Sequence, residues 1–194
     1  VVLDASAYIP TMGRDPRAEY AAGHIPGARF FDLDAASDHA TKLPHMLASA
    51  EAFGAYVGGL GIGNDDAIVV YDGSGLNISA ARVWWMFRVV YGHRNIAVLD
   101  GGFKQWRAAG RAIETTAPAI EPRAYSAKFD TSQVLDLAQM EAAVRERREG
   151  ADAELRPPPV DHDAASPSRP KSSASTSSNG GSSTVRSSTG SCAS

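Results

Sequence analysis

The first 130 residues predict an α/β domain, with a mostly parallel sheet and helices on both faces, followed by a disordered tail. Short apolar runs of strand type alternate with helical segments, a pattern typical of parallel sheets covered by helices. Helix caps and glycine or proline turns separate the segments. Large apolar side chains are concentrated in residues 1–150, so this part of the chain has enough material for a hydrophobic core.

The beginning of the chain predicts two strands on either side of a short helix. The apolar run Val1–Asp4 is expected to be a strand. A helix is expected over Arg14–Ala22, because Asp15 suits the N-cap and Pro16 the first helical position. A proline–glycine turn then leads into a second expected strand, Arg29–Leu33.

The middle of the chain predicts a helix, a buried strand and another helix. The first helix covers Ser49–Leu60 and is ended by a glycine. The apolar run Ala67–Tyr71 is expected to be the buried strand, and Ala80–Arg88 the second helix. Between them lies the loop Asp72–Ser79, which is rich in small residues. Such a loop before a helix N-terminus forms a cradle for an anion, since the first helical N–H groups have no partners within the helix.

The remaining structured part predicts one more strand–helix pair and the start of a second domain. Ile96–Leu99 is expected to be a strand and Phe103–Ala109 a helix. Residues 131–150 are interpreted as a linker and the start of an incomplete domain, because Asp136 and Gln139 have the spacing of a capping box. The prolines from position 157 exclude a central strand after it.

The tail, residues 151–194, is expected to be disordered. From Asp161 onward only Val185 is a large aliphatic or aromatic residue, and 13 of 34 positions are serine. Such a segment buries too little apolar surface to offset the entropy of ordering. Two explanations stay open: translation of a GC-rich gene in the wrong frame, or a natural disordered extension.

Composition excludes several classes of partner. The net charge of −3 gives no reason to expect nucleic acid, and no apolar run is long enough to cross a membrane.

The single cysteine, Cys192, excludes an internal disulfide and a multi-cysteine zinc site, and it suits a reducing, cytoplasmic compartment. The chain begins at Val1, so we expect a trimmed N-terminus, and any targeting segment would have been lost with it. Neither a cofactor nor a metal ion is expected, because Gly73-x-Gly75 lacks the further residues of a nucleotide-binding motif.

Five motifs together resemble the rhodanese family, specifically the N-terminal half of the two-domain thiosulfate and 3-mercaptopyruvate sulfurtransferases. In order they are Tyr20–Phe30 with its His-Ile-Pro-Gly turn, Leu43–Leu47, Tyr71-Asp72-Gly73, Arg82–Arg88 and Val98–Gly102. The resemblance implies transfer of sulfane sulfur from small-molecule donors, through a cysteine persulfide, to thiophilic acceptors such as cyanide or thiols. A thiolate is the nucleophile in such chemistry. In two-domain members the cysteine lies in the C-terminal domain, and the N-terminal domain is a catalytically silent duplicate.

This chain departs from the active pattern, so we expect it to be inactive by itself. Asp72 stands at the cysteine-equivalent position, and the tail replaces the second domain. Cys192 has no strand before it and no helix after it, so it does not match the family loop. The resemblance implies an auxiliary role for Asp34 and His45, in which the carboxylate orients the imidazole toward a serine of the other domain. The alternative is that His45 only tethers its loop.

Two further expectations concern the tryptophan helix. Arg82 and Arg88 are expected to form salt bridges with acidic residues. The helix around Trp84 and Trp85 is apolar on nearly every side, so we expect an exposed patch that favours self-association. A non-enzymatic rhodanese-like binding module is the alternative to a sulfurtransferase, whereas a related phosphatase is disfavoured because Asp72 replaces the cysteine it needs.

Overall fold

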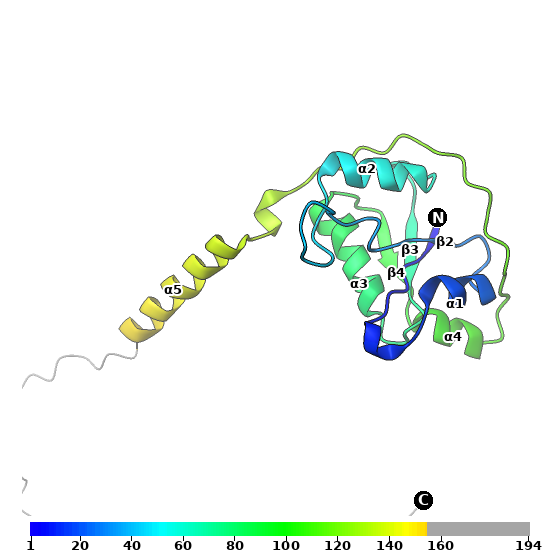
Figure 1. The fold of residues 1–194 in the computed structure, drawn as a ribbon, viewed down its shortest axis with the longest axis horizontal. Helices are drawn as coiled ribbons and strands as arrows, with labels where there is room; N and C mark the ends of the chain where they lie inside the picture. The colour runs from blue at the N-terminus through cyan, green and yellow to red at the C-terminus, as the bar shows by residue number, and fades with distance from the viewer. Residues whose placement is uncertain (155–194) are drawn as a thin grey trace, which may run out of the picture. The chain divides into compact units, whose positions relative to one another are not determined.

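The computed structural model describes residues 1–154, with side chains up to Arg147, and residues 1–147 form one compact unit (Figure 1). Its strands and helices follow the predicted alternation. They are β1 (Val2–Asp4), α1 (Pro16–Ala22), β2 (Arg29–Phe30), α2 (Ala50–Gly59), β3 (Ile68–Tyr71), α3 (Ile78–Trp85), β4 (Ile96–Val98), α4 (Gly102–Ala108) and α5 (Leu137–Glu154). Three short helical turns complete the set: η1 (Pro10–Met12), η2 (Met86–Val90) and η3 (Thr131–Gln133).

The sheet has four strands in the order β2-β1-β3-β4, and every pair is parallel. The chain moves outward from β1 to β2 on one side and from β3 to β4 on the other. The carboxyl ends of β1 and β3 therefore form the topological switch point, where α/β sheets usually bind ligands. The predicted α/β class is confirmed.

Helices cover both faces of the sheet, as predicted. The larger core lies on the side of α2 and α3, where Phe53, Val83 and Phe87 are fully buried with residues of β1 and β3. A smaller cluster on the other side joins Tyr71 to Phe103 and Trp106 of α4. Figure 1 shows α1 and α4 together on that side.

The largest differences from the sequence-based boundaries are in β2 and in the tryptophan helix. β2 ends at Phe30 rather than Leu33, because β1 ends at Asp4 and offers its last acceptor to the Phe31 N–H. The tryptophan helix begins at Ile78, and after Trp85 it widens into the π-helical turn η2. That turn carries Phe87 and Val90, both fully buried, into the larger core.

The capping box of α5 is present as predicted. The Asp136 N–H donates to Gln139 Oε1 and the Gln139 N–H donates to Asp136 Oδ1, both at 2.8 Å. The helix continues to Glu154, four residues into the range expected to be disordered. The rest of that range, including the proline run and Cys192, lies outside the described residues.

Candidate functional site

The anion cradle predicted after β3 is present, and the side chain of Asp72 fills it. Asp72 is fully buried. Its Oδ1 accepts hydrogen bonds from the N–H and hydroxyl of Ser74, at 2.9 and 2.6 Å. Its Oδ2 accepts from the Ser79 hydroxyl at 3.0 Å and from the Ala80 N–H at 3.3 Å. The carboxylate therefore occupies the position that a bound anion would take at the start of α3.

The loop geometry explains why α3 needs this carboxylate. Asn77, the N-cap, has a left-handed backbone with φ of 54° and makes no side-chain capping bond. Ala80 is the third residue of α3, whose N–H an N-cap side chain usually satisfies. Asp72 supplies that acceptor from the end of β3, and its negative charge faces the positive end of the helix. Within this chain Asp72 is a structural cap.

A chain of hydrogen bonds ties the Asp72 loop to the end of β1. The Gly73 N–H donates to Ser6 Oγ at 2.8 Å, and the Ser6 N–H donates to Asp4 Oδ1 at 3.0 Å. Arg14 Nη2 holds the Gly73 carbonyl at 3.1 Å and pairs with Glu19. Burial raises the pKa of Asp4, although the hydrogen bonds from Ser6 oppose the shift. The two loops at the switch point thus form one hydrogen-bonded unit.

The structure brings the predicted pair Asp34 and His45 together. His45 Nε2 lies 2.9 Å from Asp34 Oδ1. Both side chains are exposed, with 47% of His45 and 81% of Asp34 accessible to solvent. An exposed pair of this kind contributes only about 0–1 kcal/mol to stability. The pair is therefore free to contact a second surface, but it does little to hold this domain together.

Arg82 fixes the loop that carries His45, a role the sequence did not indicate. Its Nη2 donates to the His45 carbonyl at 2.8 Å, and its guanidinium lies 4.8 Å from the ring centroid of Trp85. His45 has a left-handed backbone with φ of 56°, so this bond secures an uncommon conformation. Partial burial lowers the pKa of Arg82. The 37 residues between donor and acceptor leave no local sequence signal for this contact.

The salt bridges expected for the two arginines of this helix are absent among the described residues. Arg82 binds the His45 carbonyl and Arg88 binds the Arg94 carbonyl. Backbone carbonyls at adjacent loops are within reach of both side chains, and they take the place of carboxylates. Trp84 and Trp85 are partly buried and pack against the larger core. Ile78 is more exposed than either tryptophan, with 67% of the residue accessible to solvent.

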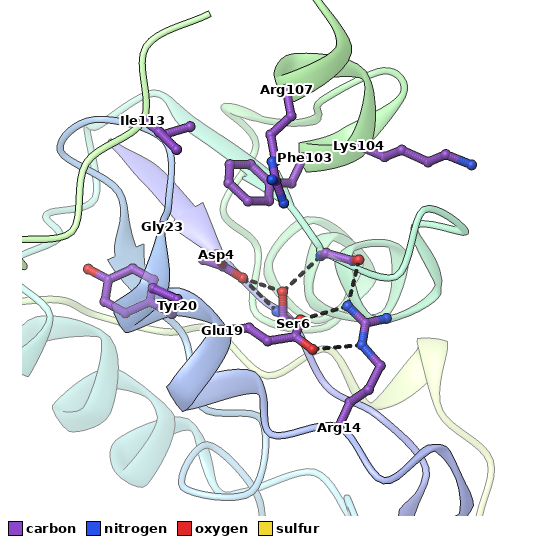
Figure 2. Close-up of a pocket in the computed structure, with 12 residues that line it drawn as sticks. Asp4, Ser6, Arg14, Glu19, Tyr20, Gly23, Phe103, Lys104, Arg107 and Ile113 are labelled. Carbon is purple, nitrogen blue, oxygen red and sulfur yellow. Dashed lines mark hydrogen bonds and ion pairs between the residues drawn. The ribbon is translucent and has the colours of Figure 1, made fainter. Parts of the chain in front are cut away.

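A cavity of about 600 Å3 lies at the switch point, and no local pattern in the sequence indicates it. It lies at the carboxyl end of β1, between α1 and α4, and we call it the β1–β3 cavity (Figure 2). Its lining includes Asp4, Ser6, Arg14, Gly73, Phe103 and Arg107. Those residues come from four separate parts of the chain, so only folding brings them together.

No cluster of three or more potential metal ligands occurs within residues 1–154. In the same range no helix has the length and apolar character to cross a bilayer.

Comparisons with known proteins give a single family. A family model described as a rhodanese-like domain matches residues 13–109. Thiosulfate/3-mercaptopyruvate sulfurtransferase 1, mitochondrial, of Arabidopsis thaliana is 57% identical over 116 residues, which cover 60% of this chain and 30% of that protein. The 3-mercaptopyruvate sulfurtransferase of Rattus norvegicus is 46% identical over 132 residues, covering 68% of this chain and 44% of the relative.

A solved structure gives the same answer for the fold. The crystal structure of SseA from Escherichia coli superposes with a TM-score of 0.70 and 33% sequence identity, covering 79% of this chain and 62% of SseA. The chain spans less than half the length of the two sulfurtransferase relatives above. The five motifs, the switch-point loop and these matches together show that the chain belongs to the rhodanese family.

Proposed function

We propose that this chain is the non-catalytic N-terminal half of a sulfurtransferase of the thiosulfate/3-mercaptopyruvate type. The names of its relatives support the reaction class. The observation that carries the non-catalytic role is the Asp72 carboxylate, which is buried in the cradle and accepts four hydrogen bonds there. In the full-length enzyme, small-molecule sulfur donors and thiophilic acceptors would react at the other domain.

The chemistry at Asp72 excludes sulfur transfer through a persulfide at this loop. A persulfide forms when a thiolate attacks the sulfane sulfur of the donor and the rest of the donor leaves. A carboxylate oxygen does not form the corresponding stable sulfur carrier, and residues 1–154 contain no cysteine. The cradle donors that would stabilise a persulfide are already satisfied by Asp72.

The exposed pair Asp34 and His45 is the part of this chain proposed to assist catalysis in the full-length enzyme. The close contact of Asp34 Oδ1 with His45 Nε2 orients the imidazole, and the exposure of the pair allows contact with a second domain. Arg82 holds the backbone of His45 in place. This pair has no reacting group to act on within residues 1–154.

The central test measures sulfur transfer and sulfur loading on the same preparation. We expect no thiocyanate above the blank from cyanide with either thiosulfate or 3-mercaptopyruvate, while an intact two-domain sulfurtransferase run in parallel gives product. Intact mass after incubation with donor should show no reductant-labile gain of one sulfur atom. Cys192→Ser is the matched control, because it removes the one thiol. Turnover or a labile sulfur adduct that persists in Cys192→Ser would overturn the proposal.

Three further points belong to the proposal. The first is that the chain is a truncated form whose serine-rich tail is out of frame. Translation of the downstream DNA in the other reading frames tests this, because a cysteine-loop domain should appear in one of them.

The second is that its location is cytoplasmic, which the sparse use of cysteine supports. One relative is named as mitochondrial, so cell fractionation decides between the compartments. Self-association through the helix of Trp84 and Trp85 is the third point, and sedimentation tests it.

A further inference from the structure

The β1–β3 cavity contains two opposite charges that have no charged partner among the described residues. Asp4 lies at its floor, with 3% of the residue exposed, and it accepts hydrogen bonds only from neutral donors. Arg107 lies at its rim on α4, and it forms no ion pair within residues 1–147. A buried charge without a counter-ion is costly, so Asp4 favours a cationic group of a ligand. The exposed Arg107 guanidinium is free to pair with an anionic group at the rim.

The other charged groups at the cavity already have partners or extend away from it. Arg14 and Glu19 form a bidentate pair, with Arg14 Nε and Nη2 donating to the Glu19 carboxylate at 2.7 and 2.6 Å. Figure 2 shows Lys104 extending away from the cavity, whereas Arg107 reaches from α4 past Phe103 toward Asp4 and Ser6. Asp4 and Arg107 are therefore the two groups left to bind a ligand.

We propose that the β1–β3 cavity binds a small zwitterion, with its ammonium group at Asp4 and its carboxylate at Arg107. The side chains of Phe103, Tyr20 and Ile113 supply apolar wall for the carbon skeleton of the ligand. The volume of about 600 Å3 is ample for a molecule the size of an amino acid. The site goes beyond the proposed function and does not depend on it.

A zwitterion is favoured over a simple anion or cation by the positions of the charges. A carboxylate alone would satisfy Arg107 but would leave Asp4 buried without a counter-ion. An ammonium alone would satisfy Asp4 but would gain nothing from the Arg107 guanidinium at the exposed rim. Burial raises the pKa of Asp4 more than the hydrogen bonds from Ser6 lower it, and no cationic side chain contributes to the shift. A ligand with both charges compensates both groups at once.

The test titrates the chain with ω-amino acids of increasing length, glycine, β-alanine and γ-aminobutyrate, by 1H–15N NMR. Acetate and ethylamine serve as the anion-only and cation-only halves of these probes. We expect saturable shifts at the amides of Ser6, Gly73 and Phe103, and a Kd for the best zwitterion about tenfold or more below that of either half. The carboxyl carbon of Asp4 should move with the zwitterion and not with acetate.

Two matched variants on α4 distinguish binding at a specific site from general attraction by positive charge. Arg107→Gln and Lys104→Gln each remove one charge from the same helix face. We expect Arg107→Gln to weaken zwitterion binding about tenfold or more, and Lys104→Gln to change it less than about twofold. Acetate binding as tightly as the zwitterions, equal effects of the two variants, or no saturable shift at the cavity would each overturn the proposal. None of these outcomes bears on sulfur transfer, which is measured separately.

Discussion

Replacing Asp72 by asparagine tests whether its carboxylate is the structural cap of α3. Asparagine keeps the size and shape of the side chain but turns one oxygen into an NH2 group. All four groups that face the Asp72 oxygens act as donors in the structure. The Ser74 and Ser79 hydroxyls can rotate to accept from an NH2 group, but the backbone N–H groups cannot. Either orientation of the amide therefore leaves one backbone N–H, that of Ser74 or of Ala80, facing a donor.

The expected loss of stability follows from these contacts. A buried N–H without an acceptor costs about 1–3 kcal/mol. Removing the negative charge from the start of α3 adds about 0.3–1 kcal/mol, and up to about 2 kcal/mol at a buried site. We therefore expect Asp72→Asn to lower the free energy of unfolding by roughly 2–4 kcal/mol, which corresponds to a fall in Tm of about 5–15 °C.

Urea unfolding followed by tryptophan fluorescence, with thermal unfolding in parallel, measures the change. Asp65→Asn is the matched control, because Asp65 is exposed and its side chain makes no hydrogen bond within the described residues. Its effect should stay within about 0.5 kcal/mol. If Asp72→Asn is as stable as Asp65→Asn, the carboxylate is not the cap of α3, and the account of the filled cradle fails.

Three other predictions concern packing, pH and association. Gly58→Ala should destabilise the fold by about 1–3 kcal/mol in the same denaturation assay, because the new Cβ would lie 2.4 Å from the Arg123 carbonyl oxygen. Gly59→Ala is its control and should be neutral or stabilising, because no atom lies within 4 Å of the new Cβ. The pKa of Asp4 is raised above its ordinary value of 3.8, so between these values the folded chain keeps a proton that the unfolded chain releases. The free energy of unfolding should therefore fall as pH rises through that window, and urea unfolding at several pH values should show this contribution missing in Asp4→Asn. Ile78→Lys should reduce self-association in sedimentation velocity experiments without loss of stability, because Ile78 is 67% exposed; unchanged association would remove this face of α3 as the contact.

Local patterns in the sequence were sufficient for the order and type of the main elements. The caps of α1 and α5 and the apolar runs of β1, β3 and β4 depend on neighbours within a few residues, so their signals are readable without the fold. The motifs that carry the rhodanese resemblance are local in the same sense. They also predict that Asp72 stands at the cysteine-equivalent position.

The tertiary structure alone decided which side chains meet. The capping of α3 by Asp72 depends on how the loop folds back, and the Arg82 contact with the His45 carbonyl spans 37 residues. The β1–β3 cavity joins Asp4 to Arg107 only because β1 lies beside β3 in the sheet and α4 packs on the same face as α1. Periodicity and composition report how each segment is buried. Which charged side chains line the same cavity depends on strand order and helix placement, which no single segment of this chain encodes.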